Sequence, residues 1–270
     1  MYAIDVHAHV FPDKLAEKAV PALASAADVK PRGKGTISDL MEKMDRANVR
    51  QSVLASIATK PSQVKSINDW LWKQKNERFI PFAALHPEDP DRFSEIERIS
   101  RLGFKGVKLH PNYQEFYPDE ERIIELAKAM ADAGLILLLH GGADWAFEEL
   151  NASPASMARL MDAVPGLSII IAHFGGFERW KDVEEILAGS PAWFDISFTL
   201  PFIDKNDFMR IARKHGTDRL LFGTDYPWAD AAEQIQLLKS MDFSPEELHA
   251  ILHENAEALL ELNQAEKSCE

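Results

Sequence analysis

The chain has 270 residues, of which 46% are hydrophobic and 27% charged, a composition typical of a globular protein with a sizeable core. Its formal net charge of −13 argues against nucleic acid or an anionic membrane as a partner, because both require a basic surface. Cys269 is the only cysteine, which excludes a disulfide within the chain and a cysteine-ligated metal. Neither a signal peptide nor an apolar run of the ~20 residues that span a membrane is visible, so we expect a cytoplasmic protein.

Short apolar segments alternate with helical segments along the whole chain. The predicted strands are residues 3–7, 52–57, 79–85, 106–110, 135–140, 168–173, 192–198 and 220–225. Several are apolar almost throughout, which is typical of parallel strands that are buried on both faces.

Helix start signals lie between these strands. Thr36 opens one helix, and acidic residues after Pro118 open another that ends at Gly134. Ser244 begins a capping box, which predicts a last helix that runs towards Leu262.

Eight strand–helix units predict a (β/α)₈ barrel, an α/β fold of the TIM-barrel type. We expect one barrel domain over residues 1–263, with an insertion at about 12–35 that caps the barrel mouth, and a polar tail at 264–270. A doubly wound open sheet is the alternative, but the chain has no Gly-rich dinucleotide-binding turn.

The first strand carries two histidines two residues apart. Side chains two residues apart in a strand point to the same side. The alternation therefore predicts that Asp5, His7 and His9 share one face, with the apolar residues between them on the other. Two imidazoles on one face suit a metal site, because the neutral imidazole nitrogen is a common metal ligand.

Ionisable residues recur where the predicted strands end. They are His7, His9, His110, His140, His173 and Asp225. In a (β/α)₈ barrel the carboxyl ends of all strands meet at one mouth, so these side chains are predicted to converge on a metal site there. Lys108 has the same inward parity as His110, so it either faces the site or pairs with an acid inside the barrel.

The remaining histidines have simpler interpretations. His215 precedes Gly216 at a predicted helix end, where the helix dipole favours a cation. His249 and His253 lie four residues apart on the last helix, where we expect a solvated helix face.

Four motifs together resemble the amidohydrolase superfamily, and specifically its amidohydrolase-related branch that includes aminocarboxymuconate-semialdehyde decarboxylase. They are the residues 5–12 (DVHAHVFP), 140–141 (HG), 173–176 (HFGG) and 221–227 (LFGTDYP). The resemblance covers essentially the whole chain. It implies a metal-dependent hydrolase-type barrel and does not specify the substrate.

The resemblance also implies one divalent metal, held by His7, His9, His140 and Asp225, with His173 as a catalytic residue beside the metal and its water. Relatives elsewhere in the superfamily hold two metals bridged by a carboxylated lysine on strand four. Lys108 lies one step short of the end of that strand, so we expect a single metal. Three imidazoles and a carboxylate suit zinc, with manganese and cobalt as alternatives.

Two reactions fit such a site. In the preferred one, a water activated by the metal attacks an ester, lactone or amide, with Asp225 and His173 as catalytic residues. The alternative is non-oxidative decarboxylation of a small aromatic or unsaturated carboxylate. A third hypothesis is an inactive barrel used for binding, which would not need the ligands to be present.

We expect a small-molecule substrate. The sequence is compatible with either a monomer or a homodimer. Candidate substrate contacts are Lys108, His110, Trp145, Arg179 and Trp228. A cation such as Arg179 would bind a substrate carboxylate, and Trp145 and Trp228 would stack on a planar ring. Each of these residues could instead be a surface charge or pack against the barrel helices.

Overall fold

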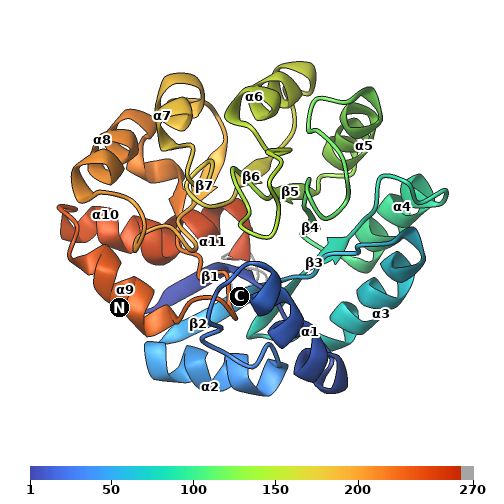
Figure 1. Cartoon of the computed structure of the whole chain (residues 1–270), viewed down its shortest axis with the longest axis horizontal. Helices are drawn as coiled ribbons and strands as arrows, with labels where there is room; N and C mark the ends of the chain where they lie inside the picture. The colour runs from blue at the N-terminus through green and yellow to red at the C-terminus, as the bar shows by residue number, and fades with distance from the viewer. Residues whose placement is uncertain (263–270) are drawn as a thin grey trace, which may run out of the picture.

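A computed structural model describes residues 1–262, and the predicted tail at 264–270, with Cys269, lies outside the described residues. Eight parallel strands follow one another in chain order around a barrel (Figure 1). They are β1 (Ala3–Ala8), β2 (Val49–Ala55), β3 (Phe79–Ala84), β4 (Gly106–Leu109), β5 (Ile136–Leu139), β6 (Ile169–Ile171), β7 (Trp193–Asp195) and β8 (Leu220–Leu221). The backbone N–H of Val6 donates to the carbonyl of Phe222 over 3.0 Å, which joins the first strand to the last. The predicted (β/α)₈ barrel is confirmed.

Helices surround the barrel (Figure 1). The α-helices are α1 (Asp13–Ala26), α2 (Ile37–Ala47), α3 (Val64–Gln74), α4 (Arg92–Leu102), α5 (Glu121–Asp132), α6 (Pro154–Ala163), α7 (Trp180–Asp182), α8 (Lys205–His215), α9 (Ala231–Lys239), α10 (Pro245–His249) and α11 (Asn255–Leu259). Shorter or wider helical turns are η1 (Pro61–Gln63), η2 (Val183–Leu187), η3 (Thr217–Arg219) and η4 (Ala250–Glu254). None of the helices in residues 1–262 is long and apolar enough to cross a membrane.

The helix start signals are confirmed at two positions. The Thr36 hydroxyl accepts a hydrogen bond from the backbone N–H of Asp39, and Ser244 forms a reciprocal capping box with Glu247. The predicted last helix is confirmed from Pro245 to Leu259, and it contains the π-helical turn η4 between α10 and α11. This turn packs beneath β8, where the N–H of Phe222 donates to the carbonyl of Ile251.

Each observed strand overlaps a predicted one. All of them end earlier near the mouth except β1, which extends one residue further, to Ala8. β6 ends at Ile171 and β8 at Leu221. Just beyond them, His173 and Asp225 have positive φ angles of 59° and 63°, so the backbone leaves the extended conformation before it reaches these residues. These two side chains therefore lie on turns that follow the strands, whereas His7 lies within β1.

The predicted alternation along β1 is wrong at one point. Between Asp5 and Ala8 the pairing with β2 shifts, so that three steps on β1 match two on β2. Ile4 and Val6 therefore pack in the barrel interior, whereas Ala8 packs in the outer layer against the helices. This irregularity interrupts the alternation between the apolar interior and the histidines of the mouth.

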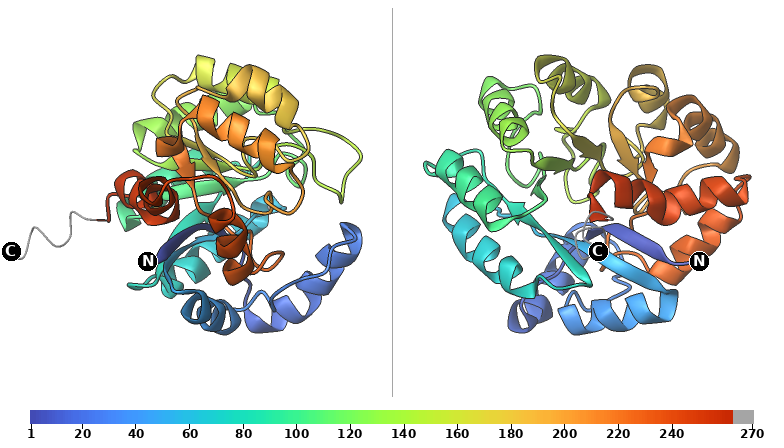
Figure 2. Two further views of the ribbon diagram at one scale, coloured as in Figure 1. Left: turned by 90° about the vertical axis from the view of Figure 1, so that its left-hand side faces the viewer. Right: turned by 180° about the vertical axis from the view of Figure 1, so that it is seen from behind.

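The barrel interior is apolar at its lower end, opposite the mouth. Its buried cluster includes Ile4, Val53, Leu138 and Leu221 from four strands, and is closed by Leu260 beside α11. Figure 2 shows α10 and α11 crossing one end of the barrel, while the long loops and α1 extend from the other. A separate outer cluster lies between the strands and the surrounding helices.

Candidate metal centre and active site

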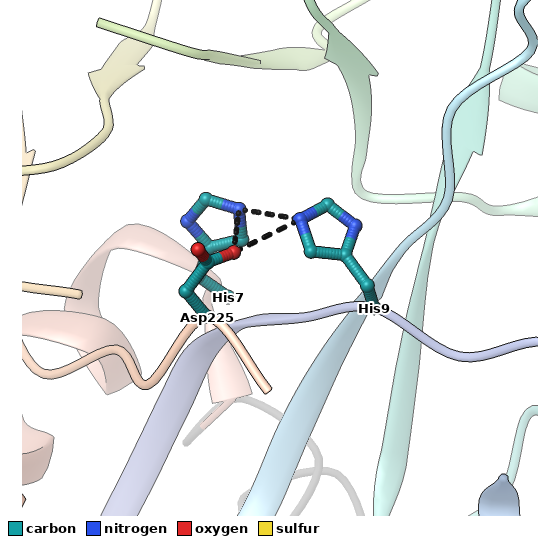
Figure 3. A group of neighbouring side chains, drawn as sticks. All are labelled: His7, His9 and Asp225. Atoms are coloured by element: carbon teal, nitrogen blue, oxygen red, sulfur yellow. Dashed lines mark hydrogen bonds and ion pairs between the residues drawn. The ribbon is translucent and has the colours of Figure 1, made fainter. Parts of the chain in front are cut away.

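Three ligand-type side chains meet at the mouth (Figure 3). The Nε2 atoms of His7 and His9 lie 3.1 Å apart. The Oδ1 atom of Asp225 lies 3.4 Å from the His7 nitrogen and 3.1 Å from the His9 nitrogen. The first strand and the turn after β8 thus bring together three of the four predicted ligands.

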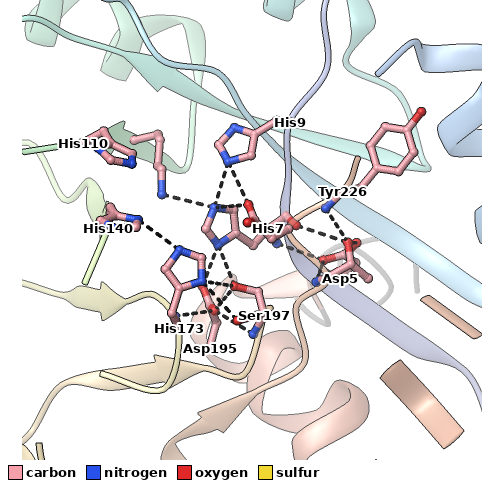
Figure 4. A network of polar contacts seen from close by, with 12 residues as sticks. Asp5, His7, His9, His110, His140, His173, Asp195, Ser197 and Tyr226 are labelled. Atoms are coloured by element: carbon pink, nitrogen blue, oxygen red, sulfur yellow. Dashed lines mark hydrogen bonds and ion pairs between the residues drawn. The ribbon is translucent and has the colours of Figure 1, made fainter. Parts of the chain in front are cut away.

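Asp195, at the end of β7, determines which nitrogen His7 presents (Figure 4). Its Oδ2 atom lies 3.0 Å from Nδ1 of His7, and both side chains are fully buried. Because Nδ1 donates its hydrogen to this carboxylate, the Nε2 lone pair points at His9 and Asp225. A carboxylate that orients a ligand histidine in this way is a frequent feature of metal sites.

His173 and His140 form a second pair beside this group. Nδ1 of His173 donates to the backbone carbonyl of Ser197 over 3.1 Å, so its Nε2 atom remains an acceptor. That atom lies 3.0 Å from Nδ1 of His140, whose own Nε2 atom donates to the carbonyl of Ala143. The structure therefore places His140 next to His173, rather than directly against His7, His9 and Asp225, and its role as a fourth ligand stays a prediction.

Burial favours the neutral form of three imidazoles, those of His7, His110 and His140. It lowers the pKa of His7 well below its usual value, and the Lys108 ammonium lowers it further. Burial likewise lowers the pKa values of His110 and His140. Neutral imidazoles are the form that binds a metal.

Lys108 lies inside the barrel mouth rather than on the surface. Its side chain is fully buried, and its Nζ atom donates to Nε2 of His7 over 3.1 Å. Burial lowers the pKa of Lys108 to about 8, although Asp225 and Asp195 act to raise it. Of the two alternatives for this lysine, the structure favours the one in which it faces the site.

The turn that carries Asp225 is held by a buried carboxylate on β1. Asp5 accepts hydrogen bonds from the backbone N–H and the hydroxyl of Thr224, at 2.9 Å and 2.6 Å, and from the N–H of His7. Burial raises the pKa of Asp5 to about 7. Asp5 therefore supports the site and is not one of its ligands. Positive φ angles at His173 and Asp225 are the strained backbone that functional sites often retain.

The residues present fit a divalent cation. With metal–ligand bonds of about 2.1 Å, adjacent ligand atoms lie about 3.0 Å apart in octahedral and about 3.4 Å apart in tetrahedral coordination. The three atoms of His7, His9 and Asp225 are separated by 3.1–3.4 Å. Two imidazoles and a carboxylate at these separations are able to hold such an ion.

A pocket of about 170 Å³ opens above these residues. Of the predicted substrate contacts, Lys108, His110, Trp145 and Trp228 line it. Arg179 does not, because its side chain is exposed at the start of α7. The tight turn over residues 173–176, with four consecutive positive φ angles, reverses the chain so that Phe177 faces the pocket instead.

The other histidines predicted on helices lie on α8, α10 and η4. His215 is 6% exposed and its ring stacks on Phe194 at 3.7 Å, so the expectation of a cation at this helix end is wrong. Burial lowers the pKa of His215 to about 4. The predicted solvated helix face is confirmed at His249, which is exposed on α10. It is wrong at His253, whose side chain is 12% exposed and whose ring stacks on Tyr2 at 4.2 Å.

Four polar side chains that contribute to the site were not predicted from the sequence. Asp195 and Ser197 share one face of the seventh predicted strand, and the alternation that singled out His7 and His9 would have found them. Asp144, whose carboxylate lies 3.2 Å from Nε2 of His110, and Tyr113 lie on loops. No periodic pattern marks loop residues.

Comparison with known proteins defines the class to which this barrel belongs. The family profile described as Amidohydrolase, of the Amidohydrolase_2 group, matches residues 4–262. The chain therefore belongs to this amidohydrolase-related family, which confirms the resemblance found in its motifs.

Individual relatives share about a quarter of their aligned residues with this chain. The chain is 25% identical over 252 residues to a gamma-resorcylate decarboxylase from a Polaromonas species, a match that covers 73% of this chain and 75% of the relative. It is 24% identical over 151 residues to a dihydroorotase from Vibrio campbellii, which covers 52% of this chain. That second match spans only 44% of the dihydroorotase.

Solved structures share the fold over nearly the whole chain. A dihydroxybenzoic acid decarboxylase from the Polaromonas species, solved with manganese and the inhibitor 2-nitroresorcinol, superposes with a TM-score of 0.72 at 19% identity and 98% coverage of both chains. An uncharacterised TIM-barrel protein from Bordetella bronchiseptica superposes with a TM-score of 0.76 at 19% identity, covering 97% of this chain and 99% of that one.

Proposed function

We propose that this protein is a metal-dependent, non-oxidative decarboxylase of a small aromatic carboxylate. The observation that carries the proposal is the pocket, in which potential metal ligands and a buried lysine form the floor and aromatic side chains form a wall. The named relatives with decarboxylase activity favour this reaction over the hydrolysis that the sequence analysis preferred.

His7, His9 and Asp225, with His140 as the predicted fourth ligand, would hold one divalent metal. Bound there, the metal would supply positive charge that orients the substrate carboxylate and stabilises the charge that develops in the reaction. Manganese is the first choice, because the related decarboxylase was solved with manganese. Zinc is the alternative.

His173 is the proposed proton donor. When the bond between the ring carbon and the carboxylate breaks, its electron pair stays on the ring carbon as carbon dioxide leaves. That carbon must then take a proton. The carbonyl of Ser197 holds Nδ1 of His173, so Nε2 is the atom from which a protonated His173 would transfer the proton. Asp225, which also lines the pocket, would hold the metal in a fixed position relative to the substrate.

The size and lining of the pocket suit one aromatic ring. An engineered protein cavity of about 150 Å³ is known to bind benzene, and this pocket holds about 170 Å³. Trp145 and Phe177 lie 5.2 Å apart between ring centroids, and Phe177 and Phe198 lie 5.6 Å apart. Aromatic side chains at such separations offer both faces and edges to a planar substrate.

The test is to purify the protein with its metal content quantified, reload it with manganese or zinc, and screen hydroxylated benzoates for release of carbon dioxide. We expect gas release with at least one compound, and loss of that release in the variant His173→Ala. His249→Ala is the matched control, because it removes an exposed histidine outside the pocket.

Hydrolysis is the second candidate, favoured by the match to dihydroorotase. Lactones and cyclic amides are therefore included in the same screen. Turnover of these compounds with proton release and no gas would overturn the decarboxylase proposal. Equal rates in His173→Ala and in the unaltered protein would overturn the role of His173.

A further inference from the structure

The pocket above the metal ligands has two unlike sides. The side built by later parts of the chain combines the aromatic residues described above with the polar or charged residues Lys108, Tyr113 and Asp144. The side built by the first sixty residues, here called the mouth wall, carries six apolar residues. They are Val10, Phe11, Leu23, Ala27, Val29 and Ile57, from the loop after β1, from α1 and the loop that follows it, and from the loop after β2.

The hydroxyl groups beside the mouth wall are already engaged. The Ser56 hydroxyl donates to the backbone carbonyl of Val10 over 3.1 Å, and the Thr59 hydroxyl donates to the side chain of Gln63 over 3.1 Å. Their hydrogens are therefore not available to an anionic group on a substrate.

Cations are also absent from this side of the pocket among the residues that the structure describes. Lys30, Arg32 and Lys34 follow Val29 directly in sequence, but all three are exposed and none lines the pocket. Arg32 pairs with Glu233. Apart from histidines, the only cation in the described lining is Lys108 at the floor, and the carboxylate of Asp144 also faces the pocket. A second substrate anion would lose its hydration without gaining a partner, which is costly.

The mouth wall is tied to the turn that carries Asp225. The backbone N–H groups of Arg32 and Gly33 donate to the carbonyl of Pro227, at 2.7 Å and 3.1 Å. The N–H of Gly35 donates to the Tyr226 hydroxyl over 3.0 Å. A Cβ atom at Gly33 would lie 2.2 Å from a ring carbon of Tyr226, so only glycine fits there. The wall therefore has a defined position relative to the metal ligands.

We propose that the mouth wall selects substrates with a single carboxylate and an apolar edge on the far side of the ring, and rejects dicarboxylates. This inference rests on the proposed function, since it places the substrate carboxylate at the floor. The ring position opposite that carboxylate then meets the wall. Each methylene buried there would improve kcat/KM by about fourfold.

The experiment compares 2,6-dihydroxybenzoate with derivatives that carry a methyl or a second carboxyl group at position 4. Binding to the manganese-loaded protein is measured by calorimetry, and carbon dioxide release is measured in parallel. We expect the methyl compound to bind at least tenfold more tightly than the dicarboxylate. In Leu23→Lys, which adds a cation to the wall, this ratio should fall by at least tenfold.

Leu15→Lys is the matched control, because Leu15 lies on the same helix, is 51% exposed and does not line the pocket. Val29→Lys provides a second wall variant should Leu23→Lys fold poorly. Equal binding of the two derivatives, no binding of either, or the same change in Leu23→Lys and Leu15→Lys would overturn the inference. Selective binding without any gas release would instead overturn the proposed function and leave the selectivity of the wall established.

Discussion

The two ends of the barrel interior differ in what their buried side chains do. At the lower end, Ile4, Leu221 and Leu260 pack in a cluster of buried apolar side chains. At the mouth, His7, Lys108 and Asp195 are equally buried, yet all three are ionisable. Burying apolar surface stabilises a fold, whereas burying ionisable groups costs stability unless they are paired.

The difference teaches how the molecule separates stability from chemistry. The apolar side chains of the lower end need no polar partners, and their packing holds the strands together. The mouth depends on a network in which each buried group is aimed by another, such as His7 by Asp195 and Thr224 by Asp5. Substitutions at the two ends should therefore have separable consequences.

The largest effect is expected at the mouth from Asp225→Asn. The amide keeps the shape but removes the negative charge shared by His7 and His9, so metal content and turnover should both collapse, turnover by about 10³-fold. Elemental analysis after gel filtration checks the metal content. A variant that retains a full complement of metal would contradict the assignment of Asp225 as a ligand.

Leu260→Ala should lower stability and leave metal content unchanged, the opposite of Asp225→Asn. Truncating a fully buried side chain in the lower cluster should cost about 2–5 kcal/mol of the free energy of unfolding, with metal content unchanged. Denaturant unfolding measures the loss. The exposed Leu15→Ala on α1 is the control and should change stability by no more than about 0.5 kcal/mol. Similar losses in the two variants would show that the lower cluster is not the main source of stability.

His215, buried in the outer layer, predicts a pH dependence of stability unconnected with the metal. Its folded pKa of about 4 lies below the usual 6.5, so its contribution is complete above pH 6.5 and is lost as the pH falls towards 4. The loss amounts to at most about 3 kcal/mol. Unfolding of wild type and His215→Gln from pH 7 to pH 4 tests this, and parallel curves would rule it out.

The smallest effect is expected from Asp195→Asn. The amide can no longer accept the hydrogen of His7 Nδ1 with full strength, so metal affinity should fall by about 10- to 100-fold while the fold persists. Metal titration checks it. Asp162→Asn, an exposed substitution on α6, should leave affinity unchanged. Unchanged affinity in Asp195→Asn would mean that Ser197, whose hydroxyl also lies 3.1 Å from Nδ1 of His7, suffices to orient the ring.

Much of the fold was predictable because it depends on periodic patterns. The eight apolar strands, the alternation with helices and the capping signals at Thr36 and Ser244 are local features. The placement of histidines and an aspartate at strand ends likewise identified the mouth. Arg179 was misplaced because a single charged residue carries no periodicity, and the turn before it redirects the chain.

The barrel and the convergence of ionisable residues at its mouth follow from the sequence alone, because the apolar strands and the residues at their ends are local features of the chain. The family followed from the resemblance of four motifs, which also implied the full set of candidate ligands. Tertiary structure decided which nitrogen of His7 faces the metal position, where His140 turns, and which side chains wall the pocket. Those outcomes depend on contacts between segments as distant as β1 and β7, and on an irregular pairing in β1 that interrupts the simple alternation. Such contacts form only when the barrel closes.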